Sequence, residues 1–509
     1  MDLNDQLKNG SPERLVEKMQ SQVGHSQQGQ IAMNDQHHFS WTLEALLNSV
    51  DGEWIGAIDS ENSVQFTSIS TDTRTLESGA LYIAIKGENF DGHAFIAQAI
   101  QQGAVAVLVS DDIESIVPGV LVEDTRIALG QFAKWHRLQM PVKKLIAVTG
   151  SNGKTTNKTL LLNIFSAVGK TLATEGNLNN DFGVPRTLLN LRPDHEYAII
   201  EMGANHPREI GYLTNLALPD IALITNASGA HLEGFGSLQG VIDTKGEIFQ
   251  GLNQREGDAL GVAIINTDSN GYQDWLSMIA DFGIQNLSSF GSSEEADVLV
   301  THFRSIESGI KFDLTFDGQC HSVSMPVLGQ HNAQNAAACV AVALNAGLNW
   351  QQIKAGLLSF TGVAGRLQKQ AIKSGCLIDD SYNANPESVK AGINALVALP
   401  GKSILCLGAM AELGEQSEIM HQEVAQYAKQ NGVDYLLVYG EAAQTMPDIF
   451  GKQGFGFDSH QYLSELVLDI LQKNSQQNLS VNVLVKGSRS AEMERITQAI
   501  LSVEKLNNR

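Results

Sequence analysis

Residues 147 to 156 read AVTGSNGKTT and have the residue types of a phosphate-binding loop. A glycine-rich turn before a helix presents backbone N–H groups to phosphate oxygens, while Lys154 adds a positive charge and the Thr155 hydroxyl suits Mg²⁺. The usual pattern has a glycine five positions before the glycine of Gly-Lys-Thr, whereas here Val148 stands there and the upstream glycine is Gly150. The motif alone therefore leaves two interpretations, a shorter phosphate cradle or an ordinary strand-to-helix turn.

Three more residues that could do chemistry follow apolar runs. Glu201 ends the run YAII, where a carboxylate at the edge of a parallel sheet is well placed as a Mg²⁺ ligand, although an exposed carboxylate would be unremarkable. His231 lies in the glycine-rich NASGAHLEGFGS, and Lys245 lies in TKGEIF. Taken alone, His231 is better explained as a structural hydrogen-bonding group and Lys245 as a solvated lysine.

The segment GQHNAQN places Asn332 and Asn335 at helical spacing before an apolar run. Their amides are suited either to capping that helix or to reaching a purine edge. Arg366 in GVAGRLQ falls between two expected domains, where it would contact a terminal phosphate or form a surface salt bridge.

Two charged clusters come after later apolar runs. IDDSYNANPES carries Asp379 and Asp380, and VKGSRS carries Lys486 and Arg489. Because parallel strands open a crevice at their carboxyl ends, both clusters are expected to face one crevice.

Short, β-branched apolar runs predict the elements that position these residues. Buried parallel strands are predicted for KLIAVTG, YAIIEMG and DIALITN, each of which ends in Gly or Asn. The same pattern of an apolar run followed by a loop returns in CLIDDSY, SILCLGAM, DYLLVYG and VNVLVKGS. The sequence therefore predicts an α/β fold with three domains: a small N-terminal α/β domain, a central mostly parallel sheet with a short phosphate loop, and a C-terminal Rossmann-like domain. The expected boundaries are 39–140, 141–362 and 363–509, after a polar extension over 1–38 that is expected to be disordered.

Composition restricts the classes of partner. The 509 residues carry a formal net charge of -22, which argues against a broad nucleic-acid or anionic-membrane surface. The longest apolar run, Ala336 to Leu344, is less than half a membrane span, and no signal-peptide pattern is present, so a cytoplasmic protein without membrane insertion is expected. The four cysteines lack metal or disulfide-framework spacing, and at least three are expected in the core.

The ordered set VTGSNGKTTNK, TEGNLNNDFGVP, EMGANHPREI, NASGAHLEGFGS, TKGEIF, GQHNAQN, DDSYNANP, MAELG and VKGSRS resembles the Mur ligases of peptidoglycan synthesis, specifically the F-type. The resemblance runs from about Phe39 to the end of the sequence. The family's phosphate loop has the short Gly-x-x-Gly-Lys-Thr form, so the resemblance implies a cradle.

The resemblance also implies a set of ATP and metal contacts. It implies ATP binding by Gly150, Ser151, Asn152, Gly153, Lys154, Thr155, Thr156, Asn332, Asn335, Arg366 and Asp380. Among these, Lys154 would contact the β- and γ-phosphates, Arg366 the γ-phosphate, and Asp380 the ribose. Two Mg²⁺ ions are implied, with Thr155 and Glu201 on one, His231 on the second, and Lys245 as a carbamylated anchor for metal-bound water.

The implied reaction is ATP-dependent amide formation through an acyl phosphate, with Lys154, Glu201, His231, Lys245 and Arg366 as catalytic residues. It would join D-alanyl-D-alanine to UDP-N-acetylmuramoyl-tripeptide and give the pentapeptide precursor, ADP and phosphate. The implied UDP-sugar-peptide contacts are Thr73, Arg74, Lys86, Asn179 and Asn180, and the implied dipeptide contacts are Asn383, Asn385 and Lys486. A monomer is expected.

Two alternatives remain at this point. The first is another ligase of the same family, one that adds diaminopimelate or lysine, or that adds glutamate to folate. Against a diaminopimelate-adding ligase, Asn-Ala-Asn-Pro at 383–386 lacks the Asp-Asn-Pro-Arg signature of those relatives. Against a folate ligase, such an enzyme would not need the domain that carries STDTR. A non-catalytic nucleotide switch would need the phosphate loop without His231, Lys245 and a carboxylate site.

Overall fold

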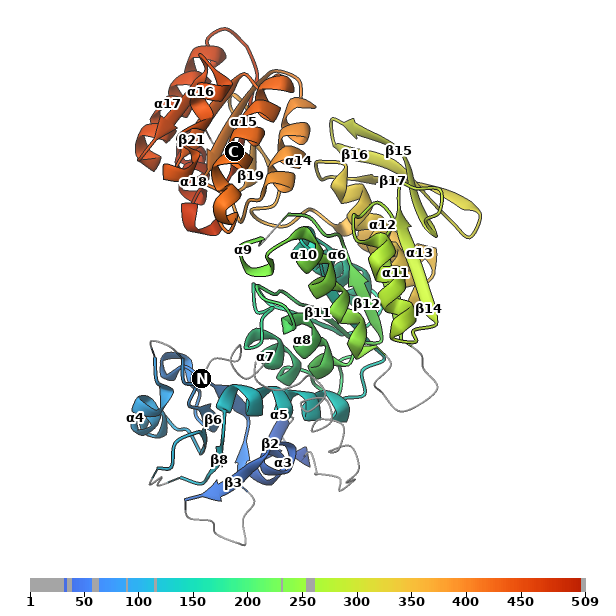
Figure 1. The fold of residues 1–509 in the computed structure, drawn as a ribbon, viewed down its shortest axis with the longest axis vertical. Coiled ribbons are helices and arrows are strands. Elements are labelled where there is room, and N and C mark those ends of the chain that lie inside the picture. The colour runs from blue at the N-terminus through green and yellow to red at the C-terminus, as the bar shows by residue number, and fades with distance from the viewer. Residues whose placement is uncertain are drawn as a thin grey trace. The chain divides into compact units, whose positions relative to one another are not determined.

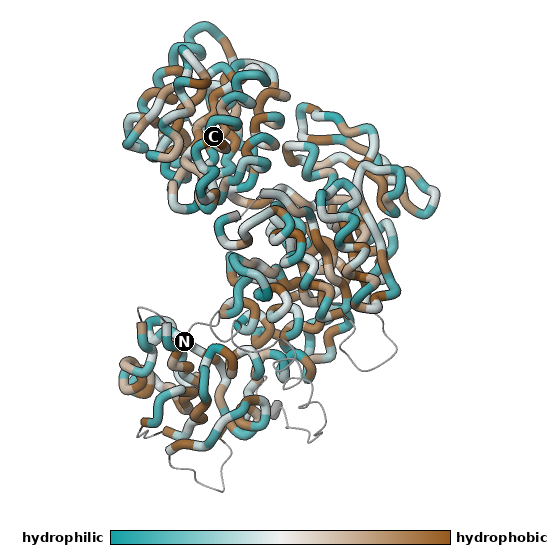
Figure 2. Tube along the Cα trace, viewed as in Figure 1, coloured by the Kyte–Doolittle hydropathy of each residue, from teal (hydrophilic) through white to brown (hydrophobic). Residues whose placement is uncertain are grey.

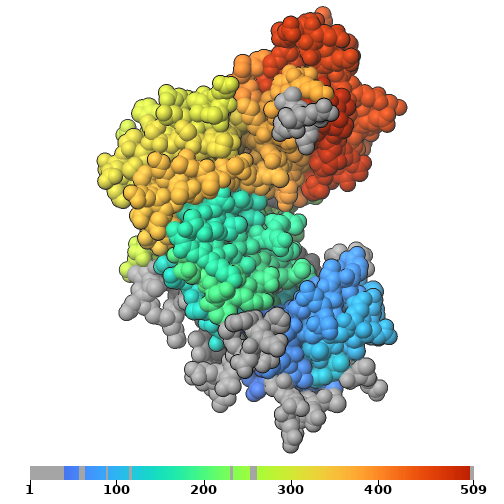
Figure 3. Space-filling model, turned by 180° about the vertical axis from the view of Figure 1, so that it is seen from behind, coloured from blue at the N-terminus to red at the C-terminus, as the bar shows by residue number. Residues whose placement is uncertain are grey.

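The computed structural model describes residues 32–33, 39–56, 64–87, 90–113, 117–229, 232–252 and 261–504. The chain divides into two compact units, the first formed by 1–141 and 181–194 and the second by 142–180 and 195–509. They can be followed by colour in Figure 3, where residues up to 141 run from blue to cyan and residues beyond 194 from green to red. Of the expected extension over 1–38, only Ala32–Met33 lie within the described residues, as a short strand. The three domain boundaries stay a proposal.

The first unit contains a five-stranded and a three-stranded sheet. The larger sheet has the order β3 (Gly52–Ile55), β8 (Gly119–Val122), β7 (Ala106–Val109), β6 (Ala80–Ile83), β5 (Ser68–Ser70), and only β3 is antiparallel to its neighbour. The smaller sheet has the order β1 (Ala32–Met33), β2 (Phe39–Thr42), β4 (Gln65–Phe66). The helices of this unit are α3 (Leu43–Ser49), α4 (Ile96–Gln101), α5 (Thr125–Gln139) and α7 (Gly183–Leu189). Asp124 caps α5 by accepting hydrogen bonds from two backbone N–H groups.

A buried histidine ties α5 to the segment after α7. The Trp41 indole N–H donates to His136 Nδ1 at 3.0 Å, and His136 Nε2 lies 3.0 Å from the Leu191 carbonyl oxygen. Nδ1 is therefore the acceptor, and the ring is neutral with its hydrogen on Nε2. Burial lowers the pKa of His136 to about 4, and the nearby Arg192 charge acts in the same direction.

Acid is therefore expected to destabilise the first unit through His136. Between the unfolded pKa near 6.5 and the folded pKa of about 4, the unfolded chain binds a proton that the folded chain does not, so stability falls as pH falls. The loss approaches about 3 kcal/mol below pH 4, at 1.36 kcal/mol per pKa unit. Urea unfolding across this range measures it, and His136→Gln should flatten the dependence whereas a matched change at the exposed His206 should not. An unchanged slope in a folded His136→Gln protein would contradict this assignment.

The second unit holds a nine-stranded sheet whose centre is parallel. Its order is β10 (Thr171–Ala173), β11 (Tyr197–Glu201), β9 (Lys144–Thr149), β12 (Ile221–Ile224), β13 (Val262–Asn266), β14 (Asn286–Gly291), β15 (Val298–Ile306), β16 (Gly309–Phe316), β17 (Gln319–Met325). All pairs from β10 to β15 are parallel, and the last two pairs are antiparallel. The central strands β9, β11, β12 and β13 are buried except at the first residue of three of them, which is why their sequences read as apolar runs.

Helices cover this sheet. α6 (Lys154–Ser166), α12 (His331–Asn345) and α13 (Trp350–Ser359) pack into one core with strands β9, β12 and β16. The remaining helices are α8 (Glu209–Ala217), α9 (Leu232–Phe235), α10 (Leu238–Gly246) and α11 (Tyr272–Asp281), visible in Figure 1. Figure 2 shows long hydrophobic stretches of the trace in the interior of this part of the chain. The phosphate loop is thus anchored between a buried strand and a buried helix.

A six-stranded sheet follows in the same unit. Its order is β18 (Gln368–Ile372), β19 (Gly375–Asp380), β23 (Val481–Lys486), β20 (Lys402–Gly408), β21 (Tyr435–Tyr439), β22 (Gly454–Phe457), and only β18 is antiparallel. One core cluster includes residues of α14 (Pro386–Val397), α15 (Ser417–Gln430) and α16 (Met446–Phe450). A second includes α17 (His460–Ser475) and α18 (Glu494–Glu504). Apolar side chains of the strands alternate between these two cores.

The predicted α/β fold with mostly parallel sheets is confirmed. Cys339, Cys376 and Cys406 are buried, as expected, and Cys320 is exposed. Within the described part of the chain, no helix combines the length and the apolar character needed to cross a membrane.

Candidate active site

The phosphate loop forms a tight turn between β9 and α6. The strand ends at Thr149 and the helix begins at Lys154, as the sequence predicts. Gly150 has φ 146° and Gly153 has φ 82°, backbone conformations that favour glycine. A Cβ on Gly150 would lie 1.9 Å from Thr225 Oγ1, so no larger residue fits there without movement. The turn is therefore built as a short cradle that needs no glycine at Val148.

The segment after β12 holds the loop from the side. The Ser151 N–H donates to the Asn226 carbonyl oxygen at 2.9 Å, and the Asn152 N–H donates to Asn226 Oδ1 at 3.0 Å. The Thr225 hydroxyl donates to the Asn152 carbonyl oxygen at 2.6 Å. These contacts fix the loop backbone before any nucleotide is bound.

Lys154 is folded back over the loop. Its Nζ donates to the Gly150 carbonyl oxygen at 2.6 Å. Burial lowers the pKa of Lys154 to about 8; Glu201 acts against this shift and Arg366 adds to it. A phosphate group in the cradle would favour the charged form, because it supplies the anion that the buried ammonium needs.

Glu201 lies at the centre of the candidate site and is almost fully buried. Its Oε1 accepts hydrogen bonds from the Thr155 hydroxyl at 3.2 Å and from Asn179 Nδ2 at 2.9 Å. Its Oε2 is buried and accepts no hydrogen bond from the described residues, while Lys158 Nζ lies 3.9 Å away. An unsatisfied buried carboxylate oxygen is costly and points to a missing partner.

A divalent cation fits this arrangement. Mg²⁺ prefers oxygen ligands, and the Thr155 hydroxyl and Glu201 carboxylate come from the carboxyl edges of neighbouring strands. The free Oε2 lone pairs are the observation that supports the fit. Thr155 and Glu201 are therefore the residues that would hold the ion.

Arg366 reaches the same hydroxyl. Its Nη2 donates to Thr155 Oγ1 at 2.9 Å, and its guanidinium lies over the Tyr382 ring, 4.3 Å from the centroid. Arg366 lies just before β18 in the sequence, and its contact with Thr155 places its positive charge beside the phosphate loop. This location favours the phosphate interpretation of Arg366 over a surface salt bridge.

Lys245 is buried at the end of α10, with 1% of its surface exposed. Burial lowers the pKa of Lys245 to about 7; Lys154 contributes to the shift, and Glu247 and Glu209 oppose it. The solvated-lysine interpretation of Lys245 is therefore wrong, because the side chain is packed against Phe235. His231 lies outside the described residues.

Asn332 and Asn335 lie inside the first two turns of α12. That helix begins at His331 and its N-cap, Gln330, forms no side-chain bond, so the capping interpretation is wrong. Asn335 Nδ2 donates to Asn332 Oδ1 at 3.0 Å, and Asn157 Nδ2 donates to Asn335 Oδ1 at 2.8 Å. This amide chain links α12 to the phosphate helix and leaves the adenine role as a proposal.

Asp380 and Lys486 form a buried ion pair at neighbouring strand ends. They face each other in the register of β19 and β23, and Lys486 Nζ donates to Asp380 Oδ2 at 2.6 Å. Asp380 Oδ1 accepts from the Leu367 N–H at 3.1 Å. Burial raises the pKa of Asp380, and Lys486 opposes the shift. One residue of each charged cluster therefore contacts the other cluster, whereas Arg489 pairs with Glu494; a shared crevice stays a prediction.

Lys486→Met is expected to lower the free energy of unfolding by about 3 kcal/mol, because it leaves Asp380 buried and unpaired. Lys473→Met provides the control: it breaks the equally short but exposed Lys473–Asp469 pair and should cost less than about 1 kcal/mol. Urea titrations of both variants measure the difference. Equal stabilities would show that Lys486 has no structural role and is free for a ligand.

Of the other proposed dipeptide contacts, Asn385 reaches the phosphate loop. It caps α14 through a bond from the Ser388 N–H, while its Nδ2 donates to Asn152 Oδ1 at 2.8 Å. Asn383 is held locally: its Oδ1 accepts from the Ala384 N–H, and its carbonyl oxygen accepts from Lys486.

Comparisons with known proteins identify the family to which the domains that carry these residues belong. The Mur ligase middle domain matches residues 148–343, the Mur ligase glutamate ligase domain matches 365–489, and the Mur ligase family catalytic domain matches 65–137. The UDP-N-acetylmuramoyl-tripeptide--D-alanyl-D-alanine ligase of Escherichia coli (strain K12) is 40% identical over 462 residues, covering 91% of this chain and 98% of its own. The chain belongs to the Mur ligase family.

Solved structures agree with this assignment. A crystal structure of MurF from Acinetobacter baumannii matches with a TM-score of 0.84 and 33% identity, over 91% of this chain and 99% of that one. MurF ligase from Thermotoga maritima in complex with ADP matches with a TM-score of 0.76 and 26% identity, over 86% and 97%. The Mur ligase fold therefore extends over most of this chain and nearly all of each of the two solved structures.

The candidate UDP-sugar-peptide residues of this Mur ligase fall in both units. In the first unit, Thr73 and Arg74 lie in a short 3₁₀ turn capped by Asp72, and the Arg74 guanidinium pairs with Asp72 at 2.6 Å. Arg74 holds the pKa of Asp72 at about 2. In the second unit, Asn179 contacts Glu201 directly, and Asn180 is exposed in the adjacent bend. Asn179 thus connects the segment after β10 to the end of β11, through Glu201 and the Gly203 N–H.

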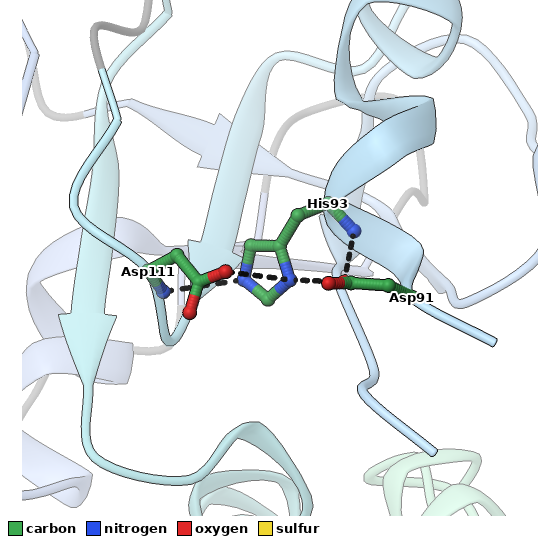
Figure 4. A group of neighbouring side chains, drawn as sticks. All are labelled: Asp91, His93 and Asp111. Carbon is green, nitrogen blue, oxygen red and sulfur yellow. Dashed lines mark hydrogen bonds and ion pairs between the residues drawn. The ribbon is translucent and has the colours of Figure 1, made fainter. Parts of the chain in front are cut away.

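Lys86 lies beside a cluster of Asp91, His93 and Asp111 (Figure 4). His93 Nδ1 contacts Asp91 Oδ1 at 2.7 Å, and His93 Nε2 accepts from the backbone N–H groups of Ser110 and Asp111. Lys86 Nζ lies 3.4 Å from Asp111 Oδ1. Although the three side chains are close enough to hold a cation, both ring nitrogens already have partners. The cluster therefore serves to hold the loop that carries Lys86.

The sequence analysis did not identify the residues that contact the candidate site residues from α6 and from the end of β12. Lys158 lies four positions after Lys154 on the phosphate helix, and Asn157 bridges to Asn335. The helical spacing from Lys154 to Lys158 was a usable signal, because it places both on one face. The contact of Thr225 and Asn226 with the loop had no such signal, since it depends on the neighbouring positions of β9 and β12.

Proposed function

We propose that this Mur ligase joins D-alanyl-D-alanine to UDP-N-acetylmuramoyl-tripeptide with ATP, through an acyl phosphate. The observation that carries the proposal is the convergence of Lys154, Thr155 and Arg366 around the buried Glu201. The reaction is the one for which the E. coli relative is named, and the ADP in the T. maritima structure supports ATP use. With nucleotide substrates of this kind, the reaction belongs in the cytoplasm.

The first chemical step brings two anions together. The tripeptide carboxylate attacks the γ-phosphorus of ATP, its oxygen forms a bond to phosphorus, and ADP leaves. Each pair of unit charges about 4 Å apart repels by roughly 4 kcal/mol at an effective dielectric of 20. Lys154 and Arg366 would offset this repulsion at the β- and γ-phosphates, while the N–H groups from Gly153 to Thr155, at the start of α6, would hold the phosphates in line.

The second step forms the amide. The neutral dipeptide amine attacks the acyl phosphate carbon, a tetrahedral species forms, and phosphate leaves with the bonding electron pair while the nitrogen gives up a proton to solvent. Asn383 and Asn385 would orient the dipeptide, and Asn385 already contacts the phosphate loop through Asn152. Lys486 would contribute its charge near them, although Asp380 is its partner here.

Two Mg²⁺ ions would neutralise phosphate charge when bound. Thr155 and Glu201 would hold one ion, and His231 the other. Lys245 would carry a carbamate, formed when its neutral amine attacks CO₂ and releases a proton. A depressed pKa of about 7 supports this, because it leaves much of the amine neutral.

Phosphate release tests the proposal against its rivals. The purified protein is incubated with ATP, D-alanyl-D-alanine, and UDP-tripeptides ending in diaminopimelate or lysine. We expect release only when both acceptor and dipeptide are present. Release that depends on a free amino acid in place of the dipeptide would favour another ligase of the family, and release without either would favour a nucleotide switch.

A further inference from the structure

Lys158 is a buried lysine beside the proposed metal site, and the proposed reaction gives it no role. Its side chain is 8% exposed, and its Nζ donates to the Thr174 carbonyl oxygen at 2.8 Å. The ammonium lies 3.9 Å from Glu201 Oε2. Burial lowers the pKa of Lys158, and Arg366 adds to this, whereas Glu201 opposes it. A buried ammonium needs a compensating anion, and Glu201 supplies it.

The two oxygens of Glu201 have different surroundings. Oε1 accepts hydrogen bonds from Thr155 and Asn179, whereas Oε2 accepts none within the described ranges and has the Lys158 ammonium 3.9 Å away. The Glu201 backbone is fixed as well, since its N–H donates to Thr174 Oγ1 at 2.9 Å. Lys158 is therefore not needed to orient the carboxylate, and its main effect on Oε2 is electrostatic.

We propose that Lys158 is a fixed counter-ion of Glu201 that weakens binding of the divalent cation until the nucleotide is present. This inference rests on the proposed function, because it assumes that Glu201 holds the ion. A cation bonded to Oε2 would be a close neighbour of the Lys158 ammonium, and like charges repel strongly where solvent is excluded. The phosphates of ATP add negative charge that offsets the repulsion. The ion would therefore enter together with ATP.

Lys158→Met tests the proposal by removing the charge while keeping an unbranched side chain. We expect the nucleotide-free protein to bind Mn²⁺ at least about tenfold more tightly, because the repulsion is lost and Glu201 keeps its donors. Electron paramagnetic resonance of free Mn²⁺ measures the dissociation constant without substrate or turnover. Lys158→Arg should bind Mn²⁺ like the wild type, and Lys354→Met, at an exposed lysine of the same sheet-and-helix region, controls for net charge.

Lys158→Gln provides a second neutral variant that keeps a donor for Thr174, should the methionine variant not fold. A folded neutral variant that binds Mn²⁺ no more tightly than the wild type would overturn the proposal. The phosphate-release assay tests the proposed function separately, since the Mn²⁺ measurement contains neither UDP-tripeptide nor dipeptide. Tighter Mn²⁺ binding in Lys158→Arg would also overturn it, because the positive charge is kept there.

Discussion

Lys154→Ala is expected to lower the ligation rate at least about 10²-fold while leaving the fold intact. Removing one preorganised group that stabilises developing charge costs this much in other enzymes. Lys154 is the first residue of α6 and its Nζ donates to the Gly150 and Ser151 carbonyl oxygens, so the substitution removes two local hydrogen bonds and no contact between strands. Steady-state phosphate release with saturating substrates measures the effect, and the exposed Lys354→Ala is the matched control.

A second measurement separates the charge from the fold. Because the pKa of Lys154 is about 8 without nucleotide, ATP binding above pH 8 should be accompanied by proton uptake as the phosphates restore the ammonium. Calorimetry in buffers of different ionisation enthalpy detects this uptake, and Lys154→Ala should lose it. A folded Lys154→Ala protein with near-normal ligation would remove Lys154 from the phosphate site.

Local patterns were sufficient for most of the elements. Continuous apolar runs predicted β9, β11 and β12, since parallel strands buried on both faces leave no polar alternation to read. The start of α6 at Lys154 followed from the glycine-rich turn. The strands β15 to β17, which extend the central sheet, were not predicted, although the alternation of β16 and the Asp-Gly turn between β16 and β17 were usable signals.

Contacts between distant site residues could be predicted only where both residues lie at the carboxyl ends of parallel strands. Thr155 and Glu201 could be placed together because both follow parallel strands, and β9 and β11 are in fact neighbours. The buried state of Lys158 could not be predicted, because a lysine on a helix is usually solvated. Its burial depends on Thr174, which follows β10 at the edge of the same sheet.

The pairing of Asp380 with Lys486 is a second contact that could not be predicted from the sequence. The sequence placed each at a strand end, but their 2.6 Å contact requires β19 and β23 to be adjacent, and 106 positions separate the two residues. Strand order of this kind is set by how the whole sheet packs, which no local pattern records. Residues implied for two different ligands thus prove to be partners of each other.

Lys245→Ala is expected to abolish ligation, and small carboxylic acids are expected to restore part of it. Lys245 is buried, its pKa is lowered to about 7, and Lys154 lies near enough to contribute to that shift. An unmodified ammonium there would repel a nearby metal ion, whereas a carbamate would supply an anion. Acetate or formate in the cavity left by the side chain would replace that anion.

The rescue distinguishes the two charge states of Lys245. Restoration by acetate, with none by methylamine, would support the carbamate, and Lys154→Ala should not respond to acetate because its missing group is a cation. Direct observation is also available: wild-type protein equilibrated with ¹³C-bicarbonate should show a carbamate resonance that Lys245→Ala lacks. Rescue by amines alone would show that Lys245 acts as a cation. The proposed second metal would then need another anion, and Glu247 and Glu209, whose charges both act on Lys245, are the candidates to replace next.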